Sequence, residues 1–315
     1  MRAWITGVTG FLGSHLAECM LQQGDEVLGT SRHSSWPPWL KHLESEVRLE
    51  SWDLSREEPS SRLWHTLRQF RPQVVFHLAA LSVPRACGDR EPTQAARAVN
   101  VEGTRRVCQV AAELRPQPRL VLASSAHVYS PPPHGGFLVR ETDPVNPSTG
   151  YGRSKLQAEQ VAAEFARRGL AVVIVRSFNH AGPRQSPQLM LSQWARQLAQ
   201  GTACLEVYNL DTWLDLLDVQ DAARAYRTLG LQGRPGVVYN LGAGSAVRTG
   251  WVLELLLGCA GFDGPCRQLR PGQRRNLVAD TARVRHLGWW PRVPLAQTVQ
   301  RTWEFWTQWA DAFPA

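Results

Sequence analysis

The chain has 315 residues, of which 43% are hydrophobic and 20% charged, and its formal net charge is +8. These proportions are those of a globular protein with one large domain or two modest ones. The basic residues are dispersed, which argues against nucleic-acid binding and fits an anionic small-molecule partner. No apolar run reaches about 18 residues, so we expect no membrane span. The six cysteines form neither a C-x-x-C pair nor a cluster with zinc spacing, so we expect reduced thiols, a cytoplasmic location and no metal site.

A glycine-rich segment follows the first predicted strand, at residues 2–6. The sequence T-G-V-T-G-F-L-G (6–13) leads from this strand into a helix, and a second strand is predicted at 26–30. Such glycines permit a tight turn and close approach of the backbone to phosphate, while the start of the helix attracts a pyrophosphate. In this context the segment predicts dinucleotide binding. The expected contacts are Gly7, Thr9, Gly10, Phe11, Leu12 and Gly13.

The end of the second strand bears on which dinucleotide is bound. Sites that prefer NAD place an acidic side chain there, on the ribose hydroxyls. Here the sequence L-G-T-S-R-H-S (28–34) has no carboxylate and offers Arg32, whose guanidinium complements a 2′-phosphate. We therefore expect NADP(H), with NAD as the alternative if Arg32 is only a solvated loop residue.

Strands and helices continue to alternate along the first half of the chain. Strands are expected at 48–51, 74–78 and 120–123, and a long helix at 93–114. This alternation predicts an α/β fold, a Rossmann-type doubly wound parallel sheet that binds its ligand at the carboxyl ends of the strands.

Tyr151 and Lys155 lie four residues apart at the start of an amphipathic run, which places them on one face of a helix. A lysine cation one turn from a phenol favours the phenolate. Lowering a tyrosine pKa by about three units requires about 4 kcal/mol of differential interaction and would produce a general acid/base near working pH. Alone, the pattern is also that of an ordinary helix surface.

Taken together, these segments resemble the extended short-chain dehydrogenase/reductases that act on nucleotide sugars. The further landmarks are D-L (53–54), H-L-A-A (77–80), N-V-E-G-T (100–104), S-S-A-H-V-Y (124–129) and Y-G-R-S-K (151–155). The resemblance implies that Ser125, Tyr151 and Lys155 are catalytic, with Tyr151 as acid/base and Lys155 on the nicotinamide ribose. It also implies cofactor contacts from Asp53, Leu54, Leu78, Ala79, Ala80, Asn100, Ser124 and Phe178.

Within that family, the segment R-S-F-N-H-A-G-P-R-Q (176–185) and the later Arg270-Pro271 are most similar to those of the GDP-4-keto-6-deoxy-mannose reductases. The resemblance implies that Asn179 and Arg270 contact a substrate diphosphate. An arginine that such enzymes carry before the D-V-x-D helix is missing from the corresponding segment W-L-D-L (213–216), and Arg184 is a candidate substitute. His127 stands where related dehydratases have a glutamate, which makes dehydration the less expected reaction.

We expect a cofactor domain at 1–178, joined by about 215–241, and a smaller substrate domain at 179–214 and 242–315. The expected activity is NADPH-dependent reduction of a nucleotide-linked 4-keto-6-deoxy sugar. The alternatives are a nucleotide-sugar 4-epimerase and a non-catalytic NADP-binding sensor. The resemblance also implies a homodimer, formed through helices near 93–114 and 150–168.

Overall fold

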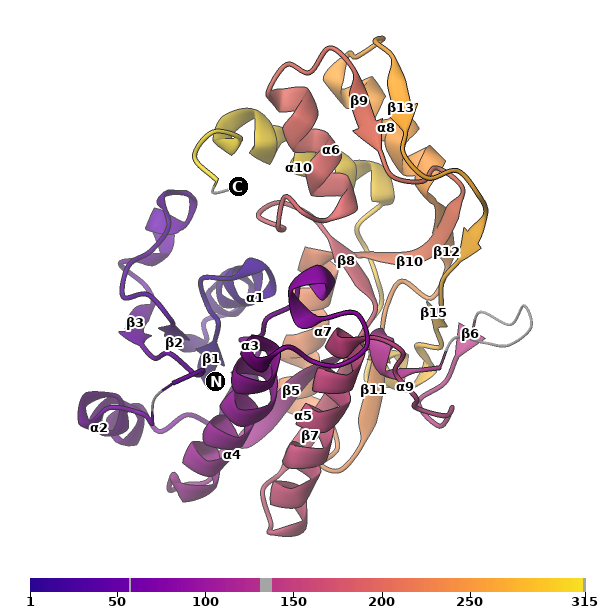
Figure 1. The fold of residues 1–315 in the computed structure, drawn as a ribbon. Helices are drawn as coiled ribbons and strands as arrows, with labels where there is room; N and C mark the ends of the chain where they lie inside the picture. Colours follow the sequence, from indigo (N-terminus) through magenta and orange to yellow (C-terminus); the bar gives the residue numbers. More distant parts are fainter. Residues whose placement is uncertain (57, 131–137, 314–315) are drawn as a thin grey trace.

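The alternating strands form a parallel sheet in the computed structural model, which describes residues 1–56, 58–130 and 138–313 (Figure 1). The sheet has seven strands: β1 (Arg2–Thr6), β2 (Glu26–Ser31), β3 (Arg48–Ser51), β4 (Val74–His77), β5 (Arg119–Ser125), β7 (Val172–Ser177) and β11 (Val238–Leu241). Their order is β11-β7-β5-β4-β1-β2-β3, and every neighbouring pair is parallel. The predicted Rossmann-type sheet is therefore confirmed.

Helices cover both faces of this sheet. On one face lie α1 (Phe11–Leu21) and α7 (Val219–Gln232), and on the other α2 (Ser61–Phe70), α4 (Gly103–Glu113) and α5 (Gly150–Arg167). Alternate residues of a strand face opposite sides, so Ala3 and Ile5 pack toward α1 and α7 while Trp4 packs toward α2 and α4. Burial of these two apolar layers is the main stabilising contribution to the lobe.

The glycine-rich turn requires its glycines for steric reasons. Gly7 has a φ of 71°, and a Cβ there would lie 2.9 Å from the backbone of Ala79 at the end of β4. A Cβ on Gly13 would collide with the carbonyl of Gly7. The turn therefore brings β1, β4 and α1 closer together than any other residue type would allow.

The helix expected at 93–114 is not regular. It consists of α3 (Gln94–Ala96), a π-helical turn η3 (Arg97–Glu102) and α4. The π turn presents Asn100, whose amide accepts from Leu81 N–H and donates to Leu81 O and to the Ser154 hydroxyl on α5. These three bonds compensate the irregular turn and fix the loop after β4 against α5.

A second lobe lies above the carboxyl ends of the sheet strands (Figure 1). Its core packs α6 (Met190–Ala199), α8 (Thr249–Ala260) and α10 (Leu295–Trp309) around the fully buried Trp194 and Trp306. Its strands are β8 (Asn179–Ala181), β9 (Leu205–Val207), β10 (Thr212–Asp218), β12 (Ala246–Arg248), β13 (Cys266–Gln268) and β14 (Arg274–Arg275). The remaining elements are β6 (Leu138–Val139), β15 (Val278–Ala279), α9 (Ala282–Arg285) and three 3-10 turns, η1 (Pro38–Leu43), η2 (Pro84–Cys87) and η4 (Ala126–Val128). Among the described residues, no helix is both long and apolar enough to cross a bilayer.

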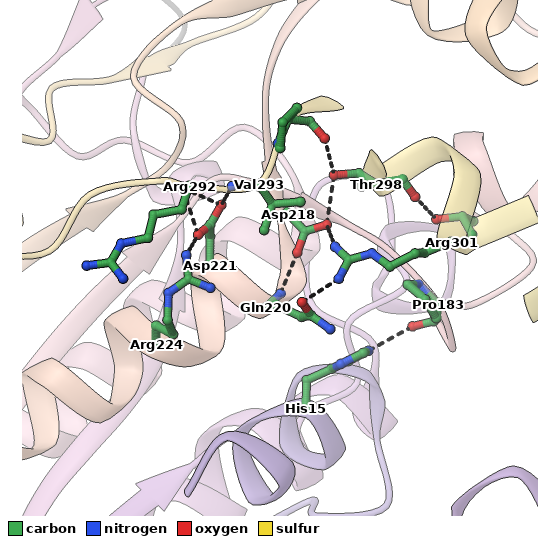
Figure 2. A network of polar contacts seen from close by, with 12 residues as sticks. His15, Pro183, Asp218, Gln220, Asp221, Arg224, Arg292, Val293, Thr298 and Arg301 are labelled. Atoms are coloured by element: carbon green, nitrogen blue, oxygen red, sulfur yellow. Dashed lines mark hydrogen bonds and ion pairs between the residues drawn. The ribbon is translucent and has the colours of Figure 1, made fainter. Parts of the chain in front are cut away.

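Buried carboxylates join the two lobes where the chain passes from β10 into α7. Asp218 caps α7 through Gln220 N–H and also accepts from Thr298 and Arg301 on α10 (Figure 2). One turn later, Asp221 accepts the backbone N–H groups of residues 292 and 293. Backbone and side-chain donors thus satisfy both acids, which fix α10 to α7.

Asp215 makes a second junction, in the middle of β10. Its carboxylate is fully buried and accepts backbone N–H groups from Ala243 (2.6 Å), Gly244 (3.0 Å) and Ala279 (3.0 Å). Burial raises the pKa of Asp215 to about 6, against the lowering effect of these three donors. The segments after β11 and at β15 are therefore attached to β10 through one side chain.

We predict that Asp215→Asn destabilises the protein by about 2–3 kcal/mol, because the amide NH₂ would face backbone N–H groups that need an acceptor. Chemical denaturation at pH 7 measures the effect. Asp211→Asn is the matched control, since Asp211 bonds the exposed Arg248 side chain. Equal stabilities of the two variants would contradict the proposed junction.

Candidate active site

The first turn of α5 is packed against two loops with no space for side chains. Thr149 caps the helix by accepting from Gly152 N–H at 3.1 Å. A Cβ on Gly150 would collide with the carbonyls of Cys87 and Gly88, and one on Gly152 with the carbonyl of His127. The helix therefore starts directly on η2 and η4, and this contact determines where Tyr151 lies.

Ser125 and Tyr151 meet at the carboxyl end of β5. Ser125 is the last residue of that strand, and its hydroxyl lies close enough to the Tyr151 phenol to affect its titration. Burial raises the pKa of Tyr151 to about 12, although the Ser125 hydroxyl lowers it. The expectation that Lys155 brings this pKa toward neutrality is wrong for this geometry, because the loss of water around the phenolate outweighs the other influences.

Lys155 is itself buried, one turn further along α5. Burial lowers the pKa of its ammonium to about 8, and Glu159 opposes that shift. Lys155 is thus a desolvated cation close to its own titration point. At pH 7 the site holds a neutral phenol and a lysine that is mostly protonated.

Glu159 continues the four-residue spacing of Tyr151 and Lys155, and sequence reasoning missed it. Its carboxylate receives two bonds from Arg176 on β7 (3.0 and 2.8 Å) and one from the Ser124 hydroxyl. Arg176 also stacks on the Tyr129 ring, with its Cζ 4.8 Å from the centroid. The pair is almost fully buried and bidentate, so it fixes α5 against β5 and β7. The four-residue spacing of positions 151, 155 and 159 was the sequence signal that could have placed Glu159 on the same face of the helix as Tyr151 and Lys155.

His127 lies beside the phenol. Its ring meets that of Tyr151 edge to face, with centroids 5.5 Å apart. His127 as a whole is exposed, but partial loss of water around its imidazole lowers its pKa. His127 is placed to contact a ligand bound at the Tyr151 hydroxyl.

The predicted cofactor residues of the glycine-rich turn lie at the start of α1. This helix begins after Gly10 with no side-chain cap, so its first N–H groups are free of side-chain acceptors. The Thr9 hydroxyl bonds that of Ser31 at the end of β2, at 2.7 Å. Backbone that no Cβ obstructs, combined with uncapped N–H groups, fits a pyrophosphate. Leu78, Ala79 and Ala80 follow β4 and are half-buried beside this turn.

Arg32 and Asp53 follow adjacent strands, at the expected adenosine end. Arg32 is exposed and contacts only the neighbouring His33 through its side chain, among the described residues. The Asp53 carboxylate accepts from the backbone and hydroxyl of Ser55, which lowers its pKa. Leu54 is buried against α4, where Gly103 leaves room for it.

Three other predicted cofactor residues have their side chains occupied within the protein. The Asn100 amide is bonded to Leu81 and Ser154, as described above. The Ser124 hydroxyl donates to Glu159. The Phe178 ring packs with Tyr129 and Ala279 in a small apolar cluster. These three side chains therefore stabilise the elements that carry the site.

The predicted substrate residues separate into two groups. Asn179 is exposed at the start of β8 and donates to the carbonyl of Asp215, and Arg270 is exposed with its guanidinium 5.1 Å from the Tyr208 centroid. Arg184, in contrast, points to α1, where it forms an ion pair with Glu18 at 2.6 Å and contacts His15. Its side chain is only 9% exposed. The structure thus offers Arg184 as a contact between the lobes and not as a substitute phosphate ligand.

The fold and this site define the class of the protein. Residues 3–242 match the model of the NAD-dependent epimerase/dehydratase family, so the chain belongs to that family. The prediction of an extended short-chain dehydrogenase/reductase is therefore confirmed, and with it the prediction of an NAD(P)-dependent enzyme family.

Individual relatives match nearly the whole chain. The chain is 29% identical to GDP-6-deoxy-D-mannose reductase of Pseudomonas aeruginosa, over 97% of each protein. It is also 29% identical to UDP-glucose 4-epimerase of Mycolicibacterium smegmatis, over 97% of this chain and 98% of the relative. The solved structure of RMD from Pseudomonas aeruginosa complexed with NADPH superposes with a TM-score of 0.79 at 28% identity, over 98% and 99% of the two chains.

The buried lysine leads to a stability prediction with a defined sign. Its pKa is lower in the folded than in the unfolded chain, so its burial is most costly below pH 8, and the cost disappears as the pH approaches 10.5. We predict that Lys155→Met raises stability at pH 7 by up to about 3 kcal/mol, with a gain that shrinks between pH 8 and 10.

Denaturant titrations across this pH range measure the gain. Lys41, the only other lysine of the chain, is 59% exposed and provides the control variant Lys41→Met. A gain that is independent of pH, or a loss of stability at pH 7, would show that Lys155 is not a desolvated cation.

Proposed function

We propose that the protein reduces the ketone of a nucleotide-linked 4-keto-6-deoxy sugar with NADPH. The observation that carries this proposal is the proximity of the Ser125 and Tyr151 hydroxyls at the carboxyl end of β5. Two hydroxyl donors converge there, on the same side of the sheet as the glycine-rich turn. The GDP-6-deoxy-D-mannose reductase relative, similar over the whole chain, supports this choice of substrate class.

The two hydroxyls have complementary tasks in this reaction. NADPH, held at the glycine-rich turn, supplies the hydride. Ser125 donates to the carbonyl oxygen and stabilises the charge that develops on it. Tyr151 protonates that oxygen, and Lys155 is proposed to bind the ribose next to the nicotinamide.

The titration state of Tyr151 supports the reductive direction. A phenol whose pKa is raised to about 12 is fully protonated at pH 7 and acts as a proton donor. Oxidation of an alcohol would require the phenolate, which burial disfavours here. A reductase uses the form that the structure already stabilises.

A second candidate function is nucleotide-sugar 4-epimerisation, favoured by the Mycolicibacterium smegmatis relative. An epimerase oxidises and then reduces the same carbon, so it consumes no NADPH. Dehydration is less well supported, because His127, whose pKa is lowered, has no acidic proton comparable to that of a carboxylic acid. A homodimer through α4 and α5 is proposed on family resemblance alone.

We predict that Tyr151→Phe lowers kcat for NADPH-dependent ketosugar reduction at least about a hundredfold, because the proton donor is lost. Cofactor affinity should remain within about twofold, since the ring still fills its site. Tyr239→Phe is the control: Tyr239 is a buried tyrosine outside the site, and its hydroxyl accepts a backbone N–H from residue 234. GDP-, UDP-, dTDP- and CDP-linked 4-ketosugars form the substrate panel, and near-normal turnover by the Tyr151 variant would rule out the assignment.

We further predict that Arg32→Asp lowers kcat/KM for NADPH about tenfold to a hundredfold and leaves that for NADH unchanged or higher. A carboxylate at the end of β2 repels a 2′-phosphate and accepts from ribose hydroxyls. Arg68→Asp on α2, where the guanidinium lies over Trp64, controls for the change of net charge. Equal losses with both cofactors would contradict recognition of the 2′-phosphate by Arg32.

A further inference from the structure

The turn after β8 contains a residue with an unfavourable backbone conformation. Arg184 has a φ of 70°, and among the described residues Arg71 is the only other non-glycine with a positive φ. Glycine adopts this left-handed conformation freely, whereas a residue with a Cβ is strained in it. Strain of this kind persists where surrounding contacts fix the residue, and it is common at functional positions.

The side chain of Arg184 supplies such contacts, because it binds two residues of helix α1. Its Nη1 and Nη2 atoms donate to the two carboxylate oxygens of Glu18, each at 2.6 Å, which makes a bidentate ion pair. Nη2 also donates to Nδ1 of His15, at 2.6 Å. Since the guanidinium is almost fully buried, water competes little for these bonds. The second lobe is thus attached to the helix that follows the glycine-rich turn.

The tautomer of His15 follows from its partners. The carbonyl of Pro183 can only accept, so Nε2 of His15 carries the proton and donates to it at 3.1 Å (Figure 2). Nδ1 is then free to accept from Arg184. Burial lowers the pKa of His15 to about 3, and the Arg184 cation adds to this effect, so the ring is neutral at pH 7. His15 therefore binds two consecutive residues of the turn in one defined orientation.

Glu18 connects three elements through one carboxylate. Besides Arg184, it accepts from Nε2 of His42 on η1, at 2.7 Å. Burial disfavours the charged carboxylate, but the bonds from Arg184 and His42 outweigh this effect and lower the pKa of Glu18. The acid is therefore ionised at pH 7, and its pair with Arg184 is a complete salt bridge.

The two ends of this cluster lie beside the two expected ligand sites. On α1, the His15 ring meets that of Phe11, an expected cofactor contact, edge to face with centroids 5.9 Å apart. On the other side, the Gln185 amide donates to the carbonyl of His180 at 2.5 Å, which closes the turn back onto β8. That strand starts at Asn179, an expected substrate contact. The buried ion pair therefore fixes the distance between the two sites.

We propose that Arg184, through His15 and Glu18, positions the second lobe so that a bound ketosugar meets the reactive face of the bound cofactor. This inference rests on the proposed function and adds a positioning residue to it. Arg184 contacts neither ligand and acts by holding two binding surfaces at one separation. Because small misplacements of reacting groups slow a reaction strongly, a side chain remote from the chemistry can control its rate.

Arg184→Gly tests the proposal, since it removes the side chain and also relieves the backbone strain. Other contacts still join the lobes, among them the bond from Arg301 to Asp218, so we expect the variant to fold. We expect kcat for ketosugar reduction to fall about tenfold to a hundredfold. The Kd for NADPH should stay within about twofold, because the glycine-rich turn is unchanged.

A kinetic isotope effect separates positioning from a loss of folded protein. With NADPH that carries deuterium at the transferred position, the isotope effect on kcat should rise in Arg184→Gly, because hydride transfer limits the rate more than product release does. A variant that is only partly folded would lose activity with its isotope effect unchanged. Glu18→Gln weakens the same pair from the other side and should reproduce the changes in kcat and isotope effect.

Hydrogen exchange of the full-length protein measures the link between the lobes without any turnover. In the wild type, NADP⁺ should slow amide exchange in the glycine-rich turn and also in residues 179–185. In Arg184→Gly the first effect should remain and the second should disappear. Arg227→Gln is the matched control, since Arg227 forms a partly buried pair with Asp25 that stays within the cofactor lobe. This variant should retain both effects.

Two results would overturn the proposal: an unchanged kcat and isotope effect in Arg184→Gly, or residues 179–185 whose response to NADP⁺ does not depend on Arg184. The pattern of failure also separates this inference from the proposed function. An Arg184-dependent exchange response without reduction of any ketosugar would remove the reductase and keep the link. Reduction that is lost in Tyr151→Phe but normal in Arg184→Gly would keep the reductase and remove the positioning role.

Discussion

The close approach of backbone at the first turn of α5 is the constraint on which the site depends. Gly150 and Gly152 have no Cβ, so η2 and η4 lie directly against the helix. This contact presents Tyr151 to Ser125 at the end of β5. It also brings the loop at Cys87 beside the start of the helix. The Glu159–Arg176 pair holds the same helix two turns further along. The packing of these backbone segments therefore determines where the catalytic side chains lie.

The second lobe is attached to this platform by polar groups as well as by its apolar core. Asp215, Asp218 and Asp221 follow one another along β10 and α7, and each accepts bonds from segments distant in sequence. Buried carboxylates are costly unless donors satisfy them, so the three positions specify one arrangement of the lobes. The Arg184–Glu18 pair and the stacking of Trp39 on Phe313 add contacts of the second lobe with α1 and η1.

The sequence was sufficient for the sheet, because the strands are short apolar runs and the glycine-rich turn has its own steric signature. Strands β1 and β3 occupy the predicted residues, and the family assignment followed from spaced motifs. The π turn at Asn100 was not predictable, since its cause is a partner loop far away in sequence. The charge state of Tyr151 was wrongly predicted for a related reason: spacing along a helix shows that Lys155 is near but not how much water the fold removes. Glu18 and Arg184 lie 166 positions apart, and only the folded chain brings them together.

The central claim is that a neutral phenol donates its proton while reduced cofactor is consumed. The most direct measurement is mass spectrometry of the product formed from a nucleotide-linked 4-ketosugar and NADPH. The NADPH carries deuterium in place of the hydride that C4 of its nicotinamide ring transfers. The account predicts one deuterium on the product carbon and one NADPH oxidised for each sugar. A sugar that changes configuration without gaining deuterium, with NADPH undiminished, would contradict it.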